Sequence, residues 1–247
     1  MMIKPAVIVT GAVGGIGRAL RETFSAAGYH VIGTDRAARK ASTAGFIELD
    51  LDQYARSARV RAETGKQFAR AIGKRPLVCL VNNAAVQIVR PIERLTGNDW
   101  QKSLNVNVIA AFLLAQQLLE RLEAAKGSVI NIASIHATLT KPGFAAYATS
   151  KAALVGLTRS MAVELGNRVR VNAICPAAID TEMLRAGFAG RDADFARLEA
   201  AHPVRRLGSP SEVASLTVML ASSKFRFISG GIFNVDGAIG ARLHDPV

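Results

Sequence analysis

Short apolar runs alternate along the chain with stretches in which apolar residues recur every three or four positions. The runs are rich in Val and Ile, which is typical of parallel strands that are buried on both faces of a sheet. The stretches between them predict helices. The alternation therefore predicts an α/β fold, a doubly wound parallel sheet with helices on both faces. The predicted strands are residues 4–10, 29–34, 46–49, 78–81, 128–133 and 169–174.

No linker rich in Pro or Ser interrupts the 247 residues, which predicts a single domain over residues 1–247. The first apolar run begins almost at Met1 and leaves no room for an export signal. No stretch approaches the roughly twenty apolar residues that span a bilayer. We therefore expect a cytoplasmic protein without a membrane partner.

Cys79 and Cys175 both fall in predicted strands and are expected to be reduced core residues, although Cys175 is also compatible with a reactive thiol. The four histidines show no ligand spacing with cysteines or acidic residues, so we predict no catalytic metal.

The formal net charge of +12 raises the question of a polyanionic partner. Part of the excess has a local explanation, because basic residues recur at helical spacing around residues 53–73 and mark one exposed face of a predicted helix. These residues are Arg56, Arg59, Lys66, Arg70 and Lys74. Non-specific attraction to polyanions is compatible with the same pattern, but no motif for specific nucleic-acid recognition is present.

A glycine-rich turn follows the first predicted strand and opens a predicted helix. It reads Gly11-Ala12-Val13-Gly14-Gly15-Ile16-Gly17. Glycines let the backbone turn sharply and approach a pyrophosphate, whose charge is stabilised by the free N–H groups and the dipole of the helix N-terminus. Because strand, turn and helix occur in this order, the segment predicts a dinucleotide site in a Rossmann-like sheet, although a merely flexible turn would have the same composition.

The second predicted strand leads to Asp35, at the distance from the glycine turn where an acidic residue meets the adenosine ribose. A carboxylate accepts hydrogen bonds from ribose hydroxyls and repels a 2′-phosphate. Arg36, Arg39 and Lys40 follow directly and point the other way, because cationic side chains bind phosphate. Asp35 makes NAD the predicted cofactor and leaves NADP as the alternative.

Tyr147 and Lys151 stand one helical turn apart in the segment Ala-Ala-Tyr-Ala-Thr-Ser-Lys-Ala-Ala-Leu. A phenol, with a reference pKa of about 10, is a poor proton donor or acceptor near neutrality. A neighbouring cation favours the phenolate, so we expect Lys151 to lower the pKa of Tyr147 and make it a proton-transfer group. Taken alone, the spacing also occurs by chance on exposed helices.

The glycine turn and the Tyr147–Lys151 pair together resemble the short-chain dehydrogenase/reductase family, and the similarity runs over nearly the whole chain. Alanine stands at positions 85, 177 and 238, where the family commonly has glycine. The cofactor-binding residues implied by the resemblance are Gly11, Gly15, Ile16, Gly17, Asp35, Asp50, Leu51, Asn83, Tyr147, Lys151, Pro176, Ile179 and Thr181.

The resemblance implies hydride transfer between NAD(H) and a secondary alcohol or ketone, with Asn107, Ser134, Tyr147 and Lys151 as catalytic residues. Ser134 would hold the substrate oxygen, Tyr147 would exchange the proton, and Asn107 would hold a water that connects Lys151 to solvent. The family also implies a homotetramer. A non-catalytic NAD-binding regulator or interaction protein on the same fold is the alternative.

In relatives, the segment matching residues 181–210 folds over the substrate as a lid. Its apolar residues predict either a pocket wall or ordinary core, and Arg185 or Arg205 could hold a carboxylate or simply be solvated. His136, two residues after Ser134, is compatible with a pocket position and with a surface loop. The sequence thus predicts an alcohol or ketone substrate without specifying its class.

Overall fold

Seven parallel strands form one sheet in the order β3-β2-β1-β4-β5-β6-β7. The computed structural model describes residues 3–36 and 45–243, so Arg39 and Lys40 lie outside the described residues. The chain runs outward from β1 to β3, crosses back to β4, and then runs outward to β7, which confirms the predicted doubly wound sheet. The strands are β1 (Ala6–Thr10), β2 (His30–Asp35), β3 (Phe46–Glu48), β4 (Leu77–Asn82), β5 (Ser128–Ile132), β6 (Arg170–Pro176) and β7 (Ile232–Val235).

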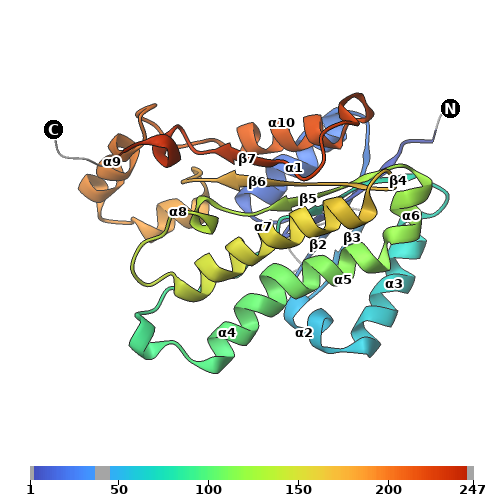
Figure 1. Ribbon diagram of the computed structural model, residues 1–247, viewed down its shortest axis with the longest axis horizontal. Coiled ribbons are helices and arrows are strands. Elements are labelled where there is room, and N and C mark those ends of the chain that lie inside the picture. The colour runs from blue at the N-terminus through green and yellow to red at the C-terminus, as the bar shows by residue number, and fades with distance from the viewer. Residues whose placement is uncertain (1–2, 37–44, 244–247) are drawn as a thin grey trace.

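Helices cover both faces of this sheet, because both faces of its central strands are apolar. In β1, Ala6 and Ile8 belong to one hydrophobic cluster, and Val7 and Val9 belong to the other. Helices α1 (Gly15–Ala26) and α10 (Pro210–Ala221) pack together on one face (Figure 1).

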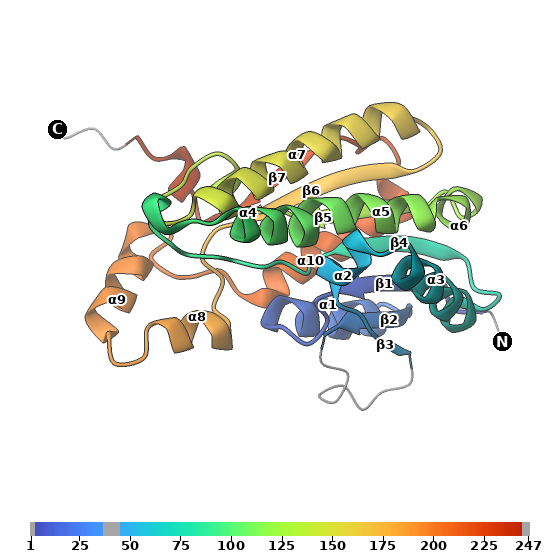
Figure 2. The same cartoon turned by 90° about the horizontal axis from the view of Figure 1, so that it is seen from below.

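The other face carries the second layer, which lies nearest the viewer in Figure 2. This layer contains α2 (Leu51–Arg56), α3 (Ala58–Ile72), α4 (Gly97–Leu104), α5 (Ala110–Gln117), α6 (Leu119–Ala124) and α7 (Ala145–Leu165). The remaining helices are α8 (Glu182–Gly187), α9 (Asp192–Ala201) and the short η2 (Ile92–Arg94), η4 (Ile135–Ala137), η5 (Ser223–Phe225) and η6 (Ile239–Ala241).

The single helix predicted around residues 53–73 is wrong, because the chain breaks into α2 and α3 at Ser57. Ser57 has an extended backbone (φ −118°, ψ 115°), and its hydroxyl accepts a hydrogen bond from the N–H of Val60 at 3.3 Å. It therefore ends one helix and caps the next. The predicted exposed face is confirmed, because the five basic residues of the stripe are all exposed, with Arg56 paired to Asp52.

The helical segment that carries Asn107 also has an irregular centre. A π-helical turn, η3 (Asn105–Ile109), lies between α4 and α5. Asn105 and Asn107 are buried within this turn. A π-helical turn changes the direction of the side chains that follow it and is common at functional sites.

Both cysteines are buried and unpaired, as expected. Burial raises the pKa of the Cys175 thiol, which keeps it protonated and makes it a poor nucleophile.

Within the described parts of the chain, no helix has the length and apolar character needed to cross a membrane.

Candidate functional site

The carboxyl ends of the strands bring the predicted site residues to one edge of the sheet. The glycine turn follows β1, Asn83 follows β4, Ser134 follows β5, and Pro176 ends β6. In a doubly wound sheet, ligands bind outside these ends, near the reversal of strand order. That reversal lies here between β1 and β4.

The glycine turn is packed so closely that two of its positions have no room for a side chain. Gly11 has φ +65°, and a Cβ there would lie 2.8 Å from the Cα of Ala84. A Cβ at Gly17 would overlap the carbonyl oxygen of Gly11 and lie 2.9 Å from the Cα of Ala12. The first turn of α1 therefore lies directly against the end of β1.

The N-terminus of α1 is not capped by a side chain. Gly14 is its N-cap, and the first turn contains no acidic residue. In contrast, side chains cap α2, α3, α4, α8 and α10. The uncapped N–H groups and the helix dipole suit an anion such as a pyrophosphate, so the residues present fit a dinucleotide.

The segment 181–210, predicted to be a lid, begins next to this helix. A Cβ at Gly15 would lie 2.8 Å from Cγ2 of Thr181, which caps α8 with its hydroxyl. Arg18 of α1 also forms an ion pair with Glu182 at 2.7 Å. Gly15 and Thr181, both predicted to contact the cofactor, are thus neighbours, and the partly buried Ile16 follows Gly15.

Thr10 holds the two strand ends together and was not predicted as a site residue. Its Oγ1 accepts hydrogen bonds at 3.0 Å from the backbone N–H groups of both Asn83 and Ala84. The Asn83 amide in turn donates to the backbone carbonyls of Thr10 at 2.9 Å and Gly11 at 3.1 Å. The only sequence feature that could have indicated this role is the position of the threonine directly before the glycine turn.

Asp35 lies beside the glycine turn. Its Oδ2 accepts a hydrogen bond from the backbone N–H of Val13 at 3.1 Å, and its Oδ1 accepts one from the backbone N–H of Arg36 at 2.8 Å. Asp50 has a local role, because its carboxylate caps α2 by accepting from the N–H groups of Asp52 and Gln53. Leu51, the first residue of α2, is buried.

Ser134, Tyr147 and Lys151 lie together where β5 meets α7. The Lys151 ammonium is buried, donates to the backbone carbonyl of Ile132 at 2.7 Å, and lies 5.7 Å from the centroid of the Tyr147 ring. Burial lowers the pKa of Lys151 to about 8. The structure thus groups these three predicted residues.

The expected effect on the pKa of Tyr147 is wrong in direction. Burial raises the pKa of the phenol above its usual value of 10, and a hydrogen bond with Ser134 only partly opposes this. The physical reason is that desolvation disfavours the phenolate, whereas the Lys151 ammonium is directed to the carbonyl of Ile132.

Asn107 connects the π-helical turn to α7. Its Nδ2 donates to the hydroxyl of Ser150 at 2.8 Å and to the carbonyl of Val86 at 3.0 Å, while its Oδ1 accepts from the N–H of Val86 at 2.8 Å. Ser150 itself donates to the carbonyl of Tyr147 at 2.7 Å. The Asn107 amide therefore positions the helix that carries Tyr147 and Lys151.

His136 lies against the phenol rather than on a remote surface loop. Its ring stacks on Phe144 at 4.5 Å and meets the Tyr147 ring edge-on at 5.6 Å, both between centroids. Its Nδ1 is hydrogen-bonded to the hydroxyl of Thr140 at 3.1 Å. Burial, followed by the charge of Lys141, lowers the pKa of His136, which favours the neutral imidazole.

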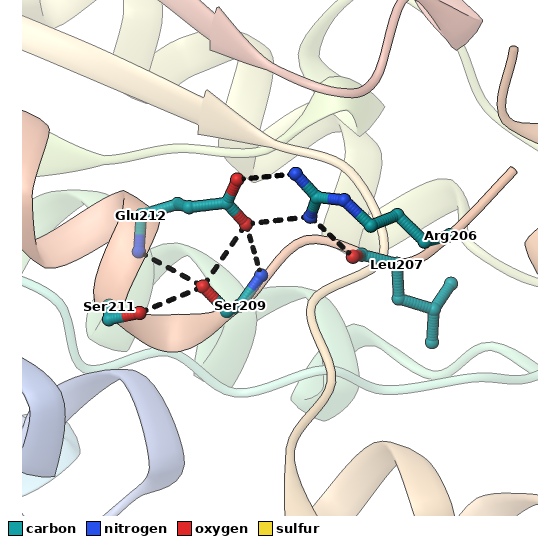
Figure 3. A network of polar contacts seen from close by, with 5 residues as sticks. All are labelled: Arg206, Leu207, Ser209, Ser211 and Glu212. Carbon is teal, nitrogen blue, oxygen red and sulfur yellow. Dashed lines mark hydrogen bonds and ion pairs between the residues drawn. The ribbon is translucent and has the colours of Figure 1, made fainter. Parts of the chain in front are cut away.

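The segment after β6 is fixed by a polar cluster at the start of α10. The Glu212 carboxylate accepts two hydrogen bonds from the Arg206 guanidinium, at 2.7 and 2.9 Å, and others from Ser209 (Figure 3). The hydrogen bonds from Arg206 are the main reason that the pKa of Glu212 is lowered to about 2. Gly208, which lies between Leu207 and Ser209, forms an isolated parallel β-bridge with the buried Ile179. The spacing of Ser209 and Glu212, three residues apart, is that of a capping box and could have predicted this helix start from the sequence.

Arg185, one candidate for binding a carboxylate in the lid, already has a partner. It forms two hydrogen bonds at 2.6 Å to the Asp180 carboxylate. The apolar residues of segment 181–210 partly pack among themselves, with Phe188 and Phe195 edge to face at 5.7 Å, whereas Met183 is exposed.

Comparison with known proteins agrees with this geometry. A family model described as enoyl-(acyl carrier protein) reductase matches residues 11–239. The chain is 36% identical to protein FixR of Bradyrhizobium diazoefficiens, over 94% of this chain and 85% of that protein. It is 32% identical to D-threitol dehydrogenase of Mycolicibacterium smegmatis, over 93% of this chain and 90% of that protein.

This chain belongs to the short-chain dehydrogenase/reductase family. Among solved structures, ligand-free aldohexose dehydrogenase of Thermoplasma acidophilum superposes with a TM-score of 0.90 at 30% identity, covering 99% of this chain and 97% of that one. Other similar solved chains contain NADH or NADP. The chain is accordingly an oxidoreductase that transfers hydride between a nicotinamide cofactor and an alcohol or ketone.

Proposed function

We propose that this chain oxidises a secondary alcohol, or reduces the corresponding ketone, with Tyr147 as the general acid and base. The observation that carries the proposal is that Ser134 hydrogen-bonds the Tyr147 phenol while the Lys151 ammonium lies 5.7 Å from the centroid of the same ring. This arrangement gives one group that exchanges a proton, one that holds the substrate oxygen, and one cation close to both. No feature of the site favours the non-catalytic alternative.

Each side chain then has a distinct role. The bound nicotinamide cofactor accepts the hydride when an alcohol is oxidised. The Ser134 hydroxyl holds the substrate oxygen, which aligns the reacting carbon. Tyr147, whose hydrogen bond with Ser134 partly opposes the effect of burial on its pKa, exchanges the hydroxyl proton, with the Lys151 ammonium 5.7 Å from the centroid of its ring. Asn107 and Ser150 position α7 through their hydrogen bond, and the proton leaves through Lys151 toward solvent.

The proposed cofactor is NAD. The support is Asp35, whose carboxylate is held against the glycine turn by Val13 and would face the adenosine ribose. Arg36 is the adjacent cation and favours NADP, so the two cofactors must be compared directly. The expected result is a higher kcat/KM with NAD, and a preference for NADP would refute this assignment.

The segment 181–210 is proposed as the substrate lid of a single domain. The ion pair between Glu182 of this segment and Arg18 of α1 supports a position over the cofactor site.

A homotetramer is proposed by analogy with the family and is testable by light scattering. A cytoplasmic location is proposed as well, and the two unpaired cysteines support a reducing compartment.

Replacing Tyr147 with Phe tests the central assignment. The Tyr147→Phe variant should bind NAD almost as well as the wild type, because the ring remains, but should lose turnover of every secondary alcohol that the wild type oxidises. The panel should include hydroxy acids, sugar alcohols and cyclic alcohols. Retention of more than a few per cent of the wild-type activity would contradict the proposal.

A further inference from the structure

A hollow of about 450 Å³ lies between the end of α9 and the C-terminal segment. It is lined by Ala200, Pro203, Arg205, Ala238, Ala241 and Arg242. Both elements lie at the end of the molecule where the lid is found (Figure 1). The two charged side chains of its lining are both arginines, which favours an anionic occupant.

The hollow adjoins the proposed substrate site through η6. A Cβ at Gly240, in η6, would lie 3.7 Å from the side chain of Ile135. Ile135 directly follows Ser134. One side of the segment around η6 therefore lies against the residue that follows Ser134, while Ala238 and Ala241 of the same segment line the hollow.

The charges of the two arginines are not neutralised by ion pairs in the described parts of the chain. Arg205 donates from Nη1 to the backbone carbonyl of Ala200 at 3.3 Å, and neither Arg205 nor Arg242 forms an ion pair with a described acidic residue. In contrast, the lid residues Arg185 and Arg197 are paired with Asp180 and Asp194, respectively. Arg205 and Arg242 thus provide donors that a ligand could use.

Backbone conformation adds an independent observation. Three non-glycine residues among those described have positive φ, and two of them, Arg205 (φ +58°) and Ala238 (φ +66°), line this hollow. A left-handed conformation costs free energy for any residue with a Cβ, whereas glycine adopts it readily. An arginine at such a position is therefore expected to have a side-chain role that offsets the strain.

We propose that Arg205 and Arg242 bind the carboxylate or phosphoryl group of an anionic alcohol substrate whose hydroxyl reacts at Tyr147. The inference rests on the proposed dehydrogenase function and narrows its substrate to hydroxy acids or phosphorylated sugar alcohols that extend past Ile135. Guanidinium groups bind both kinds of anion through paired hydrogen bonds.

Three variants test the two arginines. Arg205→Gly removes the guanidinium and relieves the left-handed strain, so its melting temperature should be no lower than that of the wild type. Arg242→Gln removes the other charge with little change in volume. Arg197→Gln is the matched control, because Arg197 is an exposed arginine of α9 that does not line the hollow.

The first readout is calorimetric binding of malonate and of inorganic phosphate to the full chain in the presence of NAD. The wild type and Arg197→Gln should bind at least one of these anions at millimolar concentration, and Arg205→Gly and Arg242→Gln should each bind it about tenfold more weakly. The stronger of the two probes identifies the anion as a carboxylate or a phosphoryl group. Absence of wild-type binding, or equal affinity in all four proteins, would overturn the proposal.

The second readout is the kcat/KM for gluconate and sorbitol 6-phosphate relative to neutral sorbitol. The preference for an anionic over the neutral substrate should fall about tenfold in Arg205→Gly and stay unchanged in Arg197→Gln. Anion binding without any such change in preference would show that the hollow does not bind substrate, and would refute the proposal. Failure of the dehydrogenase assignment is detected separately, because the wild type would then oxidise neither the anionic nor the neutral alcohols, whereas failure of the anion site leaves turnover of neutral sorbitol intact.

Discussion

The Lys151 ammonium donates a hydrogen bond to the backbone carbonyl of Ile132 at 2.7 Å. Ile132 is the last residue of β5, and Ser134 follows two positions later. This bond therefore ties the helix that carries Tyr147 to the strand that leads to Ser134. The ammonium is buried, and burial lowers its pKa from 10.5 to about 8.

Replacing Lys151 with Met should change how stability depends on pH. Below about pH 8 both the folded and the unfolded protein carry the lysine charge, and the folded state bears the cost of its burial. As the pH rises through 8, the folded protein releases the proton before the unfolded chain does. The unfolding free energy of the wild type should therefore rise relative to Lys151→Met, by about 2 kcal/mol between about pH 7 and about pH 9.5.

Urea unfolding of both proteins at several pH values measures this difference. Because only the difference between the two proteins is compared, other titrating groups largely cancel. A difference that stays constant over this range would show that the Lys151 pKa is not lowered. Turnover should be lost in Lys151→Met at every pH, since the bond that ties α7 to β5 beside Ser134 is lost.

The packing of α1 predicts a large effect of one added methyl group in the glycine turn. In Gly17→Ala, the new Cβ would overlap the Gly11 carbonyl and press on the backbone of Ala12. Backbone cannot move as a flexible side chain would, so α1 must shift away from β1. We expect a loss of about 3 kcal/mol or more in unfolding free energy, together with loss of cofactor binding.

Gly14→Ala is the matched control for this prediction. A Cβ at Gly14 would meet only the Gly11 carbonyl, at 3.6 Å, and the φ of Gly14 is −70°. This substitution should cost only about 0.5–1 kcal/mol, because alanine is a poorer N-cap residue than glycine. Equal stability of the two variants, measured by chemical denaturation, would contradict the close packing at Gly17.

Substitutions of the two buried asparagines in the π-helical turn should affect stability alike but catalysis differently. Asn107 bonds to Ser150 and Val86, whereas Asn105 bonds to Asp52 and Gln101, away from α7. Asn107→Ala and Asn105→Ala should each cost about 1–3 kcal/mol of stability, because each leaves buried polar groups unpaired. Only Asn107→Ala should also lower kcat, by about tenfold or more, because α7 loses its positioning bond.

The kcat values of Asn107→Ala and Asn105→Ala are compared by steady-state kinetics at a temperature where both variants are folded. If Asn105→Ala lowered kcat as much as Asn107→Ala did, the effect would be a general consequence of the distorted turn. The proposed positioning role of Asn107 would then be lost.

The strands were predictable because apolar side chains cover both faces of the sheet. Ala6 to Val9 are all fully buried, and no polar residue interrupts their pattern. The break at Ser57 escaped prediction for a related reason. The basic residues keep their helical spacing across it, and only the capping serine marks the boundary.

The proximity of the predicted site residues could be predicted from the sequence, but their electrostatics could not. The order of the motifs identified Ser134, Tyr147 and Lys151, because strand ends and helix turns place such residues predictably. Sequence spacing gives the separation of Tyr147 and Lys151 along the helix, but it does not give their burial. The raised pKa of Tyr147 and the bond from Lys151 to Ile132 depend on tertiary packing.

His136 offers a test of how the site contacts its substrate. In His136→Phe, the aromatic ring would keep its stacking on Phe144, but both ring nitrogens would be lost. Nδ1 is bonded to Thr140, whereas Nε2 has no hydrogen-bond partner among the described residues and is the nitrogen that a substrate group could meet. We expect KM for the alcohol to rise about 2- to 10-fold, the range of one neutral hydrogen bond, with kcat nearly unchanged.

His30→Phe is the control, because His30 begins β2, at the opposite end of that strand from Asp35 and the cofactor edge. It should leave KM unaltered. An unchanged KM in His136→Phe would mean that the imidazole serves only the aromatic packing around Tyr147. A loss of kcat instead would place His136 in the proton-transfer step, because a group that only binds substrate affects KM alone.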